Sequence, residues 1–194
     1  MEMPPQLTGG QQARLFSSLK LSNKEQIATA TLLAVFRLVP ELLGNLIGET
    51  GFRINNRTKF DAFTEVHLSK TKGPKNDRPD GFIYVKNRNE WTAIVEAKVG
   101  NSTLSLEQVT RYAEDARANG INALITISNE FTPRVEQSPL DIPKRLQTKV
   151  RIYHLSWRLI LSTAILMRNR TDIEDREKLF VIGELIRFLR DDSV

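Results

Sequence analysis

The chain has 194 residues, of which 40% are apolar and 26% charged, and this composition excludes a disordered or fibrous chain. It has no cysteine, which excludes a disulfide scaffold, a cysteine-ligated metal site and a cysteine nucleophile. The net charge is +5, and residues 51–100 hold ten Lys and Arg against six Asp and Glu, a pattern that favours a phosphate-rich partner. No apolar run approaches the roughly 20 residues that span a bilayer, and the N-terminus does not read as a secretory signal. We therefore expect a cytoplasmic protein with no membrane partner.

The N-terminal part, residues 11–49, is predicted to be helical. Ser22 and Glu25 have the capping-box spacing, in which each side chain bonds a backbone N–H of the first helical turn. Apolar residues then recur at helical spacing up to Pro40, which lacks an amide hydrogen and is expected to divide the helix in two. Gly48 is placed to end the second piece.

The hydrophobic periodicity then changes from that of a helix to that of strands. The segments Phe60–Leu68, Gly81–Val85 and Trp91–Val99 are predicted to be strands. The polar residues 86–90 form a turn, so the second and third strands are expected to pair as a hairpin.

A helix over Leu106–Asn119 follows. Ser105 and Gln108 form a second capping box, and Gly120 supplies the left-handed conformation that ends the helix.

The C-terminal third begins with an apolar run at 122–128, expected to be a buried central strand. Residues 129–147 contain three prolines and are expected to form a surface loop, and residues 150–155 a further strand. Thr171 and Glu174 are predicted to cap a last helix.

This order of elements predicts an α/β fold with a mixed β-sheet flanked by helices. We expect a single domain, composed of a helical N-terminal part at 11–49, a core at 58–157 and C-terminal helices at 158–190.

Two carboxylates are predicted to meet at one end of the sheet. Alternation along Trp91–Val99 places Glu96 and Lys98 on the same face. The hairpin turn brings the chain back to Asp80, so Asp80 and Glu96 converge. Such carboxylates repel each other unless a divalent cation lies between them, and oxygen ligands suit Mg²⁺ or Mn²⁺. A metal at that position, beside a lysine, meets the needs of phosphodiester hydrolysis.

These residues also resemble a known signature. Pro79-Asp80, fifteen residues and then Glu96-Ala97-Lys98 resembles the motif of the PD-(D/E)xK nuclease superfamily, which has a restriction-endonuclease-like core. Gln108 and Tyr112 match the Q-x-x-x-Y element found in one branch of that superfamily. The resemblance covers residues 60–128, about a third of the chain.

The resemblance implies that Asp80 and Glu96 are metal ligands, with the carbonyl of Ala97 as an additional ligand. It implies that Lys98 is the base that orients the water, or a group that stabilises charge.

The resemblance further implies that Gln108 orients the water held by the metal, or a phosphate, with Tyr112 in support. The superfamily usually has one more acidic ligand upstream, often on the first core helix. Glu65 is the preferred candidate here although it lies on a predicted strand, and Glu41 and Glu49 are competitors.

Each of these residues also has an ordinary structural interpretation. Asp80 is suited to a turn that opens a strand. Glu96 and Lys98 can form a solvated ion pair, Gln108 a helix cap, and Tyr112 part of the core.

A basic loop precedes the motif and either contacts a phosphate backbone or is simply an exposed surface loop. Its charged residues are Lys70, Lys72, Lys75 and Arg78. We assign no metal or proton-transfer role to the two histidines, His67 and His154.

We therefore expect a hydrolase: a Mg²⁺-dependent DNA endonuclease, with Mn²⁺ as an alternative metal, in restriction, antiviral defence or repair. The alternative is a nucleic-acid-binding or regulatory and oligomerisation subunit that keeps the fold without catalysis. A homodimer or larger complex is expected because many such enzymes cut both strands as dimers. The sequence leaves open whether the substrate is double-stranded DNA, single-stranded DNA or RNA.

Overall fold

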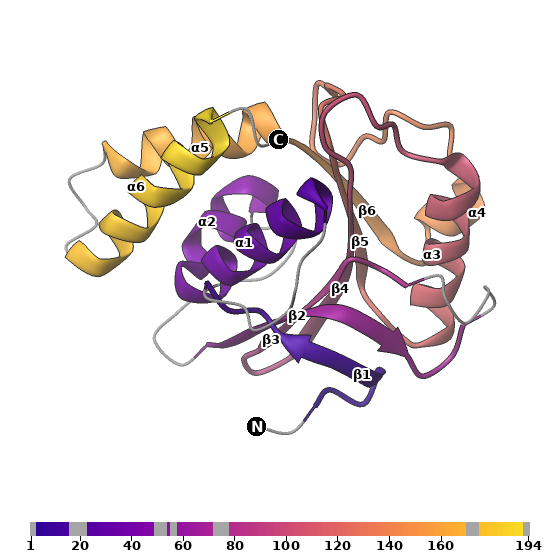
Figure 1. Cartoon of the computed structure of the whole chain (residues 1–194). Helices are drawn as coiled ribbons and strands as arrows, with labels where there is room; N and C mark the ends of the chain where they lie inside the picture. The colour runs from indigo at the N-terminus through magenta and orange to yellow at the C-terminus, as the bar shows by residue number, and fades with distance from the viewer. Residues whose placement is uncertain are drawn as a thin grey trace.

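A computed structural model describes residues 3–15, 23–48, 54, 58–71, 78–169 and 175–191. These residues form one six-stranded mixed sheet, in the order β1-β2-β3-β4-β5-β6, with helices on both faces, as the sequence predicts (Figure 1). The strands are β1 (Leu7–Gln12), β2 (Lys59–Leu68), β3 (Gly81–Lys86), β4 (Glu90–Ala97), β5 (Ala123–Ser128) and β6 (Arg151–Ser156). The helices are α1 (Lys24–Leu38), α2 (Pro40–Ile47), α3 (Leu106–Ala118), α4 (Lys144–Gln147), α5 (Trp157–Arg168) and α6 (Arg176–Arg190).

Strand direction changes in the middle of the sheet. Strands β1 to β4 are antiparallel neighbours, whereas β4, β5 and β6 run parallel. Parallel strands need a crossover, and α3 supplies the one between β4 and β5. The carboxyl ends of β4, β5 and β6 therefore lie at the same edge of the sheet.

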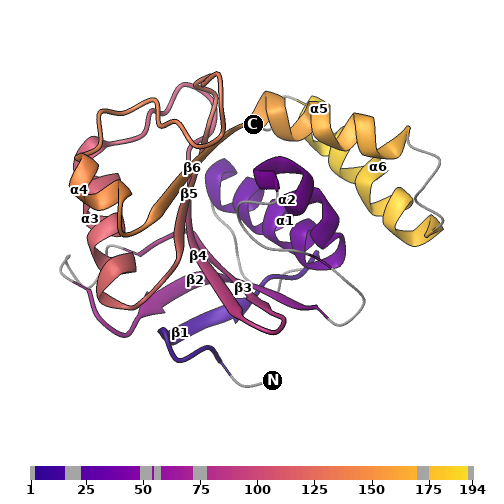
Figure 2. The ribbon, with the colours of Figure 1, turned by 180° about the vertical axis from the view of Figure 1, so that it is seen from behind.

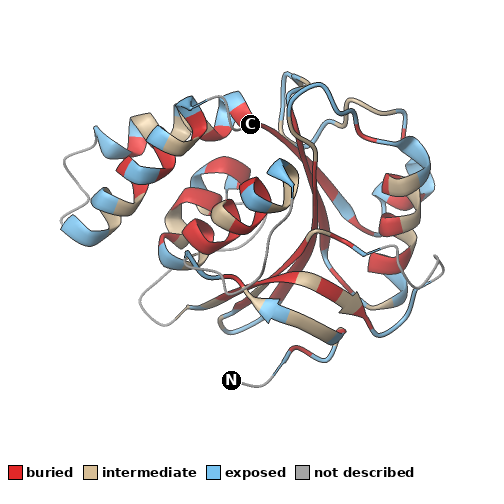
Figure 3. Ribbon diagram, in the orientation of Figure 1, coloured by how far each residue is buried: buried red, intermediate tan, exposed pale blue. Residues whose placement is uncertain are grey.

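The helices cover the sheet unequally. Helices α3 and α4 lie on one face, α1 and α2 lie on the other, and α5 and α6 form a further layer outside α1 and α2 (Figures 1 and 2). Buried residues form two apolar clusters, one on each side of the sheet, and the central strands are buried along their length (Figure 3). From Trp91 to Ala97, β4 is consequently buried on both faces.

Pro40 divides the first helical segment as predicted. Helix α1 ends at Leu38, α2 begins at Pro40, and the two axes differ by 101°. Gly48 follows α2 with a φ of 65°, the left-handed conformation that glycine adopts readily. Among the described residues, no single helix is both long enough and apolar enough to cross a bilayer.

Several elements differ from the sequence prediction. The strand β1 was not expected, and it takes residues 11 and 12 out of the predicted helical part. Its sequence, Leu-Thr-Gly-Gly-Gln-Gln, contains two glycines and a single β-branched residue, so its intrinsic strand propensity is low. The strand therefore forms because it pairs with β2. A single turn of helix, α4, interrupts the predicted loop 129–147.

Two helices are capped by residues other than those that the sequence predicts. Asn23 caps α1 by accepting a hydrogen bond of 2.7 Å from the N–H of Gln26, while Ser22 lies outside the described residues. Asp175 caps α6, and the predicted caps Thr171 and Glu174 lie outside the described residues. The Ser105 cap of α3 is confirmed, because its side chain accepts from the N–H of Gln108.

The two edge strands of the sheet, β1 and β6, differ in their backbone hydrogen bonding. The pairing of β1 with β2 shifts register twice, between Leu7 and Gly9 and between Gly9 and Gln11. At the other edge, the N–H of His154 in β6 donates 2.7 Å to the carbonyl of Val135 in the preceding loop.

Gly81 is required by close packing between α1 and the sheet. A Cβ atom at this position would lie 2.2 Å from Cδ1 of Leu33 in α1 and 3.1 Å from the carbonyl oxygen of Phe63 in β2. Helix α1 therefore approaches β3 closely at the residue that follows Asp80.

The variant Gly81→Ala is expected to lower the melting temperature by several degrees, because Leu33 must move and the backbone of β2 cannot yield freely. Gly183→Ala, at a position in α6 where an added Cβ meets nothing nearer than 3.9 Å, is the control without a clash. Thermal unfolding followed by circular dichroism tests this, and equal melting temperatures for wild type and Gly81→Ala would contradict it.

Candidate active site

Asp80 and Glu96 lie side by side at the end of the β3–β4 hairpin. Gly81 pairs with Val95, which places the preceding residue, Asp80, next to Glu96. The Oδ2 of Asp80 accepts a hydrogen bond of 2.8 Å from the backbone N–H of Ala97. The predicted convergence of the two carboxylates is therefore present in the structure.

Lys98 completes this group. Its Nζ donates to Oε1 of Glu96 at 2.7 Å, to Oε1 of Glu25 at 3.0 Å and to the carbonyl of Ala97 at 3.1 Å. The indole N–H of Trp157, the first residue of α5, donates 2.8 Å to the carbonyl of Lys98 and so fixes its backbone. Two carboxylates, those of Glu25 and Glu96, thus bond one ammonium group, and the charge of Asp80 acts on the same ammonium.

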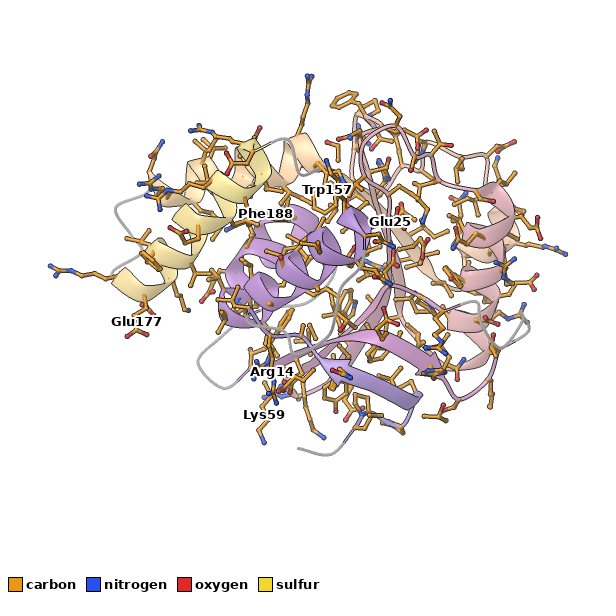
Figure 4. The ribbon with its side chains drawn as sticks, viewed as in Figure 1. Arg14, Glu25, Lys59, Trp157, Glu177 and Phe188 are labelled. Carbon is orange, nitrogen blue, oxygen red and sulfur yellow. The ribbon has the colours of Figure 1, made fainter. Side chains whose placement is uncertain are left out.

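Glu25 is the residue that the sequence prediction missed. It belongs to the first turn of α1 and faces the sheet where the central strands end (Figure 4). The capping-box pattern assigned its carboxylate to the backbone of its own helix, but Asn23 provides the cap and Glu25 bonds Lys98 instead. The signal was an acidic residue near the start of the first core helix, the element on which the resemblance places the upstream acid.

The charges of this group are out of balance. Burial raises the pKa of Asp80 to about 6, although the N–H of Ala97 and the charge of Lys98 act in the opposite direction. Burial and then repulsion by Asp80 raise the pKa of Glu96 to about 8. Burial acts to lower the pKa of Lys98, but the charge and hydrogen bond of Glu96 and the hydrogen bond of Glu25 outweigh it, so its pKa is raised. Lys98 therefore keeps its proton at neutral pH.

The residues of the site fit a hard divalent cation. The second carboxylate oxygen of Glu96, Oε2, is buried and has no hydrogen-bond partner. The available donors are carboxylate and carbonyl oxygens, which Mg²⁺ and Mn²⁺ prefer. A cation would also compensate the negative charge of the two carboxylates, whose pKa values burial and, to a lesser degree, repulsion raise. Within the described ranges, no three His, Asp or Glu side chains already stand close enough together to hold a metal between them.

The preferred upstream acid, Glu65, lies beside the group but does not bond to it. Thr64 pairs with Gly81, so Glu65 is level with Asp80 in the sheet, and its charge contributes to the raised pKa of Asp80. Its oxygens contact Nε2 of Gln26 at 3.3 Å and a guanidinium nitrogen of Arg78 at 3.9 Å. Its φ of 52° is the one left-handed value among the described non-glycine residues.

Of the two competing acids, Glu41 does not join the group. Glu41, in α2, forms an ion pair of 2.5 Å with Lys178 of α6, so its bond holds two helices together. Glu49 lies outside the described residues.

Gln108 and Tyr112 bond each other. The Nε2 of Gln108 donates 3.3 Å to the hydroxyl of Tyr112, which is buried in the cluster between α3 and the sheet. In the basic loop, Lys70 and Arg78 are exposed, while Lys72 and Lys75 lie outside the described residues.

A row of polar residues extends the site across the parallel strands. Glu96 pairs with Thr126 in β5, and Thr126 pairs with His154 in β6. The hydroxyl of Thr126 lies 3.0 Å from Nδ1 of His154, and Nε2 of His154 donates 2.9 Å to the carbonyl of Glu130. Burial lowers the pKa of His154, so the imidazole is neutral at pH 7.

The chain matches no protein-family model, and no curated protein is similar to it in sequence.

The raised pKa values predict how stability depends on pH in the absence of divalent metal. Between the unfolded values of 3.8 and 4.5 and the folded values of about 6 and about 8, the folded chain binds more protons than the unfolded chain. The contribution of Asp80 and Glu96 to stability is therefore greatest at low pH and is lost as the pH rises through this window.

Asp80→Asn is accordingly expected to raise the melting temperature at pH 8 in EDTA. Asparagine keeps an oxygen that accepts from Ala97 and removes the repulsion with Glu96. We expect a gain of roughly 2–8 °C, because about 1–2 kcal/mol in the free energy of unfolding raises the melting temperature by roughly 2–4 °C per kcal/mol in a chain of this size. Asp141→Asn, at an exposed loop residue, is the matched control. A lower melting temperature for Asp80→Asn than for this control would contradict the charge imbalance.

Proposed function

We propose that the protein is a metal-dependent nuclease that hydrolyses phosphodiester bonds in DNA. The observation that carries the proposal is the group of Asp80, Glu96 and Lys98, formed where β3 begins and β4 ends. This group supports the resemblance to PD-(D/E)xK nucleases because the two halves of the motif, separated by fifteen residues, meet in one place. The sheet order and the crossover by α3 are compatible with the core that the resemblance implies.

The metal would be held by Asp80 and Glu96, with the carbonyl of Ala97 as a further oxygen ligand. A bound Mg²⁺ supplies Lewis-acid chemistry, in that it polarises a phosphoryl oxygen and lowers the pKa of water. The buried and unpartnered Oε2 of Glu96 supports this assignment, because a buried carboxylate oxygen without a partner is costly.

Lys98 is suited to stabilise charge. Its raised pKa keeps the ammonium protonated, so it can donate hydrogen bonds to the phosphate oxygens on which negative charge develops. Removal of a proton from the attacking water by Lys98 would first require Lys98 to lose its own proton, and Glu25 and Glu96 oppose that loss.

Glu25 is the better candidate for the upstream acid. It lies on the first helix, where the resemblance places that residue, and it shares Lys98 with Glu96. Glu65 instead bonds Gln26 and Arg78. The proposed metal-binding group is therefore Asp80, Glu96 and Ala97, with Glu25 in place of Glu65.

DNA as the substrate, a cytoplasmic location, a homodimer and a role in restriction, antiviral defence or repair form the wider part of the proposal. The positive charge of residues 51–100 supports a nucleic-acid partner, since this segment leads into Asp80 and contains Lys98.

Cleavage of plasmid and single-stranded DNA in Mg²⁺ or Mn²⁺ tests the activity. We expect cleavage by the wild type, none in EDTA, and rates lower by about 100-fold or more for Asp80→Asn and Lys98→Ala, which remove a ligand and a charge-stabilising donor. The control is Glu177→Gln. Glu177 lies in the first turn of α6, far from Glu25 (Figure 4), so this variant should cleave as the wild type does.

Two results would count against this proposal. Undiminished cleavage by both variants would show that the site lies elsewhere. DNA binding without cleavage by any form would favour the non-catalytic binding or regulatory subunit.

The upstream acid can be tested separately with the isosteric pair Glu25→Gln and Glu65→Gln. Glu25→Gln is expected to lower the cleavage rate strongly, because it removes a negative charge 3.0 Å from Lys98, whereas Glu65→Gln is expected to change it little. The reverse order of rates under the same conditions would restore Glu65 as the ligand.

A further inference from the structure

A pocket of about 520 Å³ opens at the edge of the sheet opposite Asp80 and Glu96. It lies where the parallel strands β4, β5 and β6 begin, between the end of α3 and the turn that joins α4 to β6. Trp91 lines the pocket and Glu96 belongs to the candidate active site, five residues along the same strand. At about 3.3 Å per residue, roughly 16 Å separate the two places.

The lining of this pocket is positively charged. Arg117, Lys149 and Arg151 contribute exposed basic side chains, and no lining residue is acidic. In the described part of the chain, no carboxylate forms an ion pair with Arg117 or Lys149. Like charges gathered in a hollow focus their field on whatever enters it, so the pocket favours an anion.

The negative end of α3 does not cancel this charge. The carbonyls of its last turn are bonded by the chain that follows, because Ile121 N–H donates to Ala116 at 2.8 Å and Gly120 N–H to Arg117 at 3.3 Å. These bonds satisfy carbonyls that would otherwise repel an anion at the end of a helix.

Uncharged groups line the rest of the pocket and suit an organic ligand better than a bare ion. The Oδ1 of Asn122 accepts from the N–H and the hydroxyl of Thr92 at 2.9 and 3.2 Å, so Asn122 can offer its amide nitrogen to a ligand. The Nε2 of Gln147 donates 2.8 Å to the carbonyl of Ile142, so its amide oxygen is the group that it can present. Trp91, which is mostly buried in the core, forms part of the wall.

We propose that this pocket binds a nucleotide phosphate. Guanidinium and ammonium groups bind phosphate oxygens by charge-assisted hydrogen bonds, while amide groups can contact a base or sugar. The volume lies within the range of small-ligand pockets. The phosphate ester belongs either to a free nucleotide or to a nucleic-acid strand, and the inference does not depend on the proposed nuclease activity.

Titration calorimetry without divalent metal tests the proposal, using AMP, inorganic phosphate and a short 5′-phosphorylated single-stranded DNA as probes. The background is Asp80→Asn, which keeps the DNA intact and leaves the pocket unchanged. We compare Arg117→Gln/Lys149→Gln with Arg176→Gln/Arg190→Gln, a pair of exposed α6 residues that gives the same change in net charge.

The pocket variant is expected to bind its probe at least about tenfold more weakly, and the α6 variant as tightly as the parent. Binding of AMP identifies a free nucleotide, whereas pocket-dependent binding of DNA alone identifies strand phosphates. Equal weakening in the two double variants, or no binding of any probe by the parent, would overturn the proposal. If the pocket binds in this way but the wild-type chain does not cleave DNA in Mg²⁺ or Mn²⁺, the proposed function is refuted and the phosphate pocket is not.

Discussion

Two carboxylates that lie side by side at one end of the sheet constrain how the elements around them are placed. Asp80 and Glu96 repel each other, and the ammonium of Lys98 is the cation that compensates them within the described chain. Lys98 in turn is held by Glu25 from the start of α1 and by Trp157 from the start of α5. The ends of two strands and the beginnings of two helices are thus brought to one point by a balance of charge.

That balance is incomplete, and the incompleteness connects stability with chemistry. Two carboxylates bond one ammonium, a third carboxylate, that of Asp80, adds its charge, and one buried oxygen of Glu96 has no donor. A fold selected for stability alone would replace such a group with apolar residues of similar size. Sites that act on substrates often keep unfavourable charges, because the same unsatisfied groups bind a cation or stabilise charge during reaction.

Most of the sheet could be predicted because its strands alternate and are bounded by clear turns. The predicted hairpin places Asp80 beside Glu96 from the sequence alone, since a tight turn fixes the register of its two strands. The strand at residues 7–12 could not be predicted, because it forms by pairing with β2 and has little strand propensity of its own. Glu25 was missed for a related reason. Its local pattern indicated a helix cap, whereas its partner, Lys98, is 73 residues away in the sequence and is brought to it by the packing of α1 on the sheet.

The two register shifts in β1 and the cover over β6 have a consequence for self-association. Addition of strands from another molecule requires a regular edge strand with unpaired backbone N–H and C=O groups, and such edge strands lead to uncontrolled polymerisation. Here the edge strand β1 is interrupted by register shifts at Gly9. On the other edge strand, β6, the carbonyl of Val135 already accepts a hydrogen bond from the N–H of His154. The chain thus discourages continuation of its sheet into a neighbouring molecule. The most exposed apolar side chains of α5 and α6, Leu166 and Phe180, belong to the outer helical layer and not to the sheet.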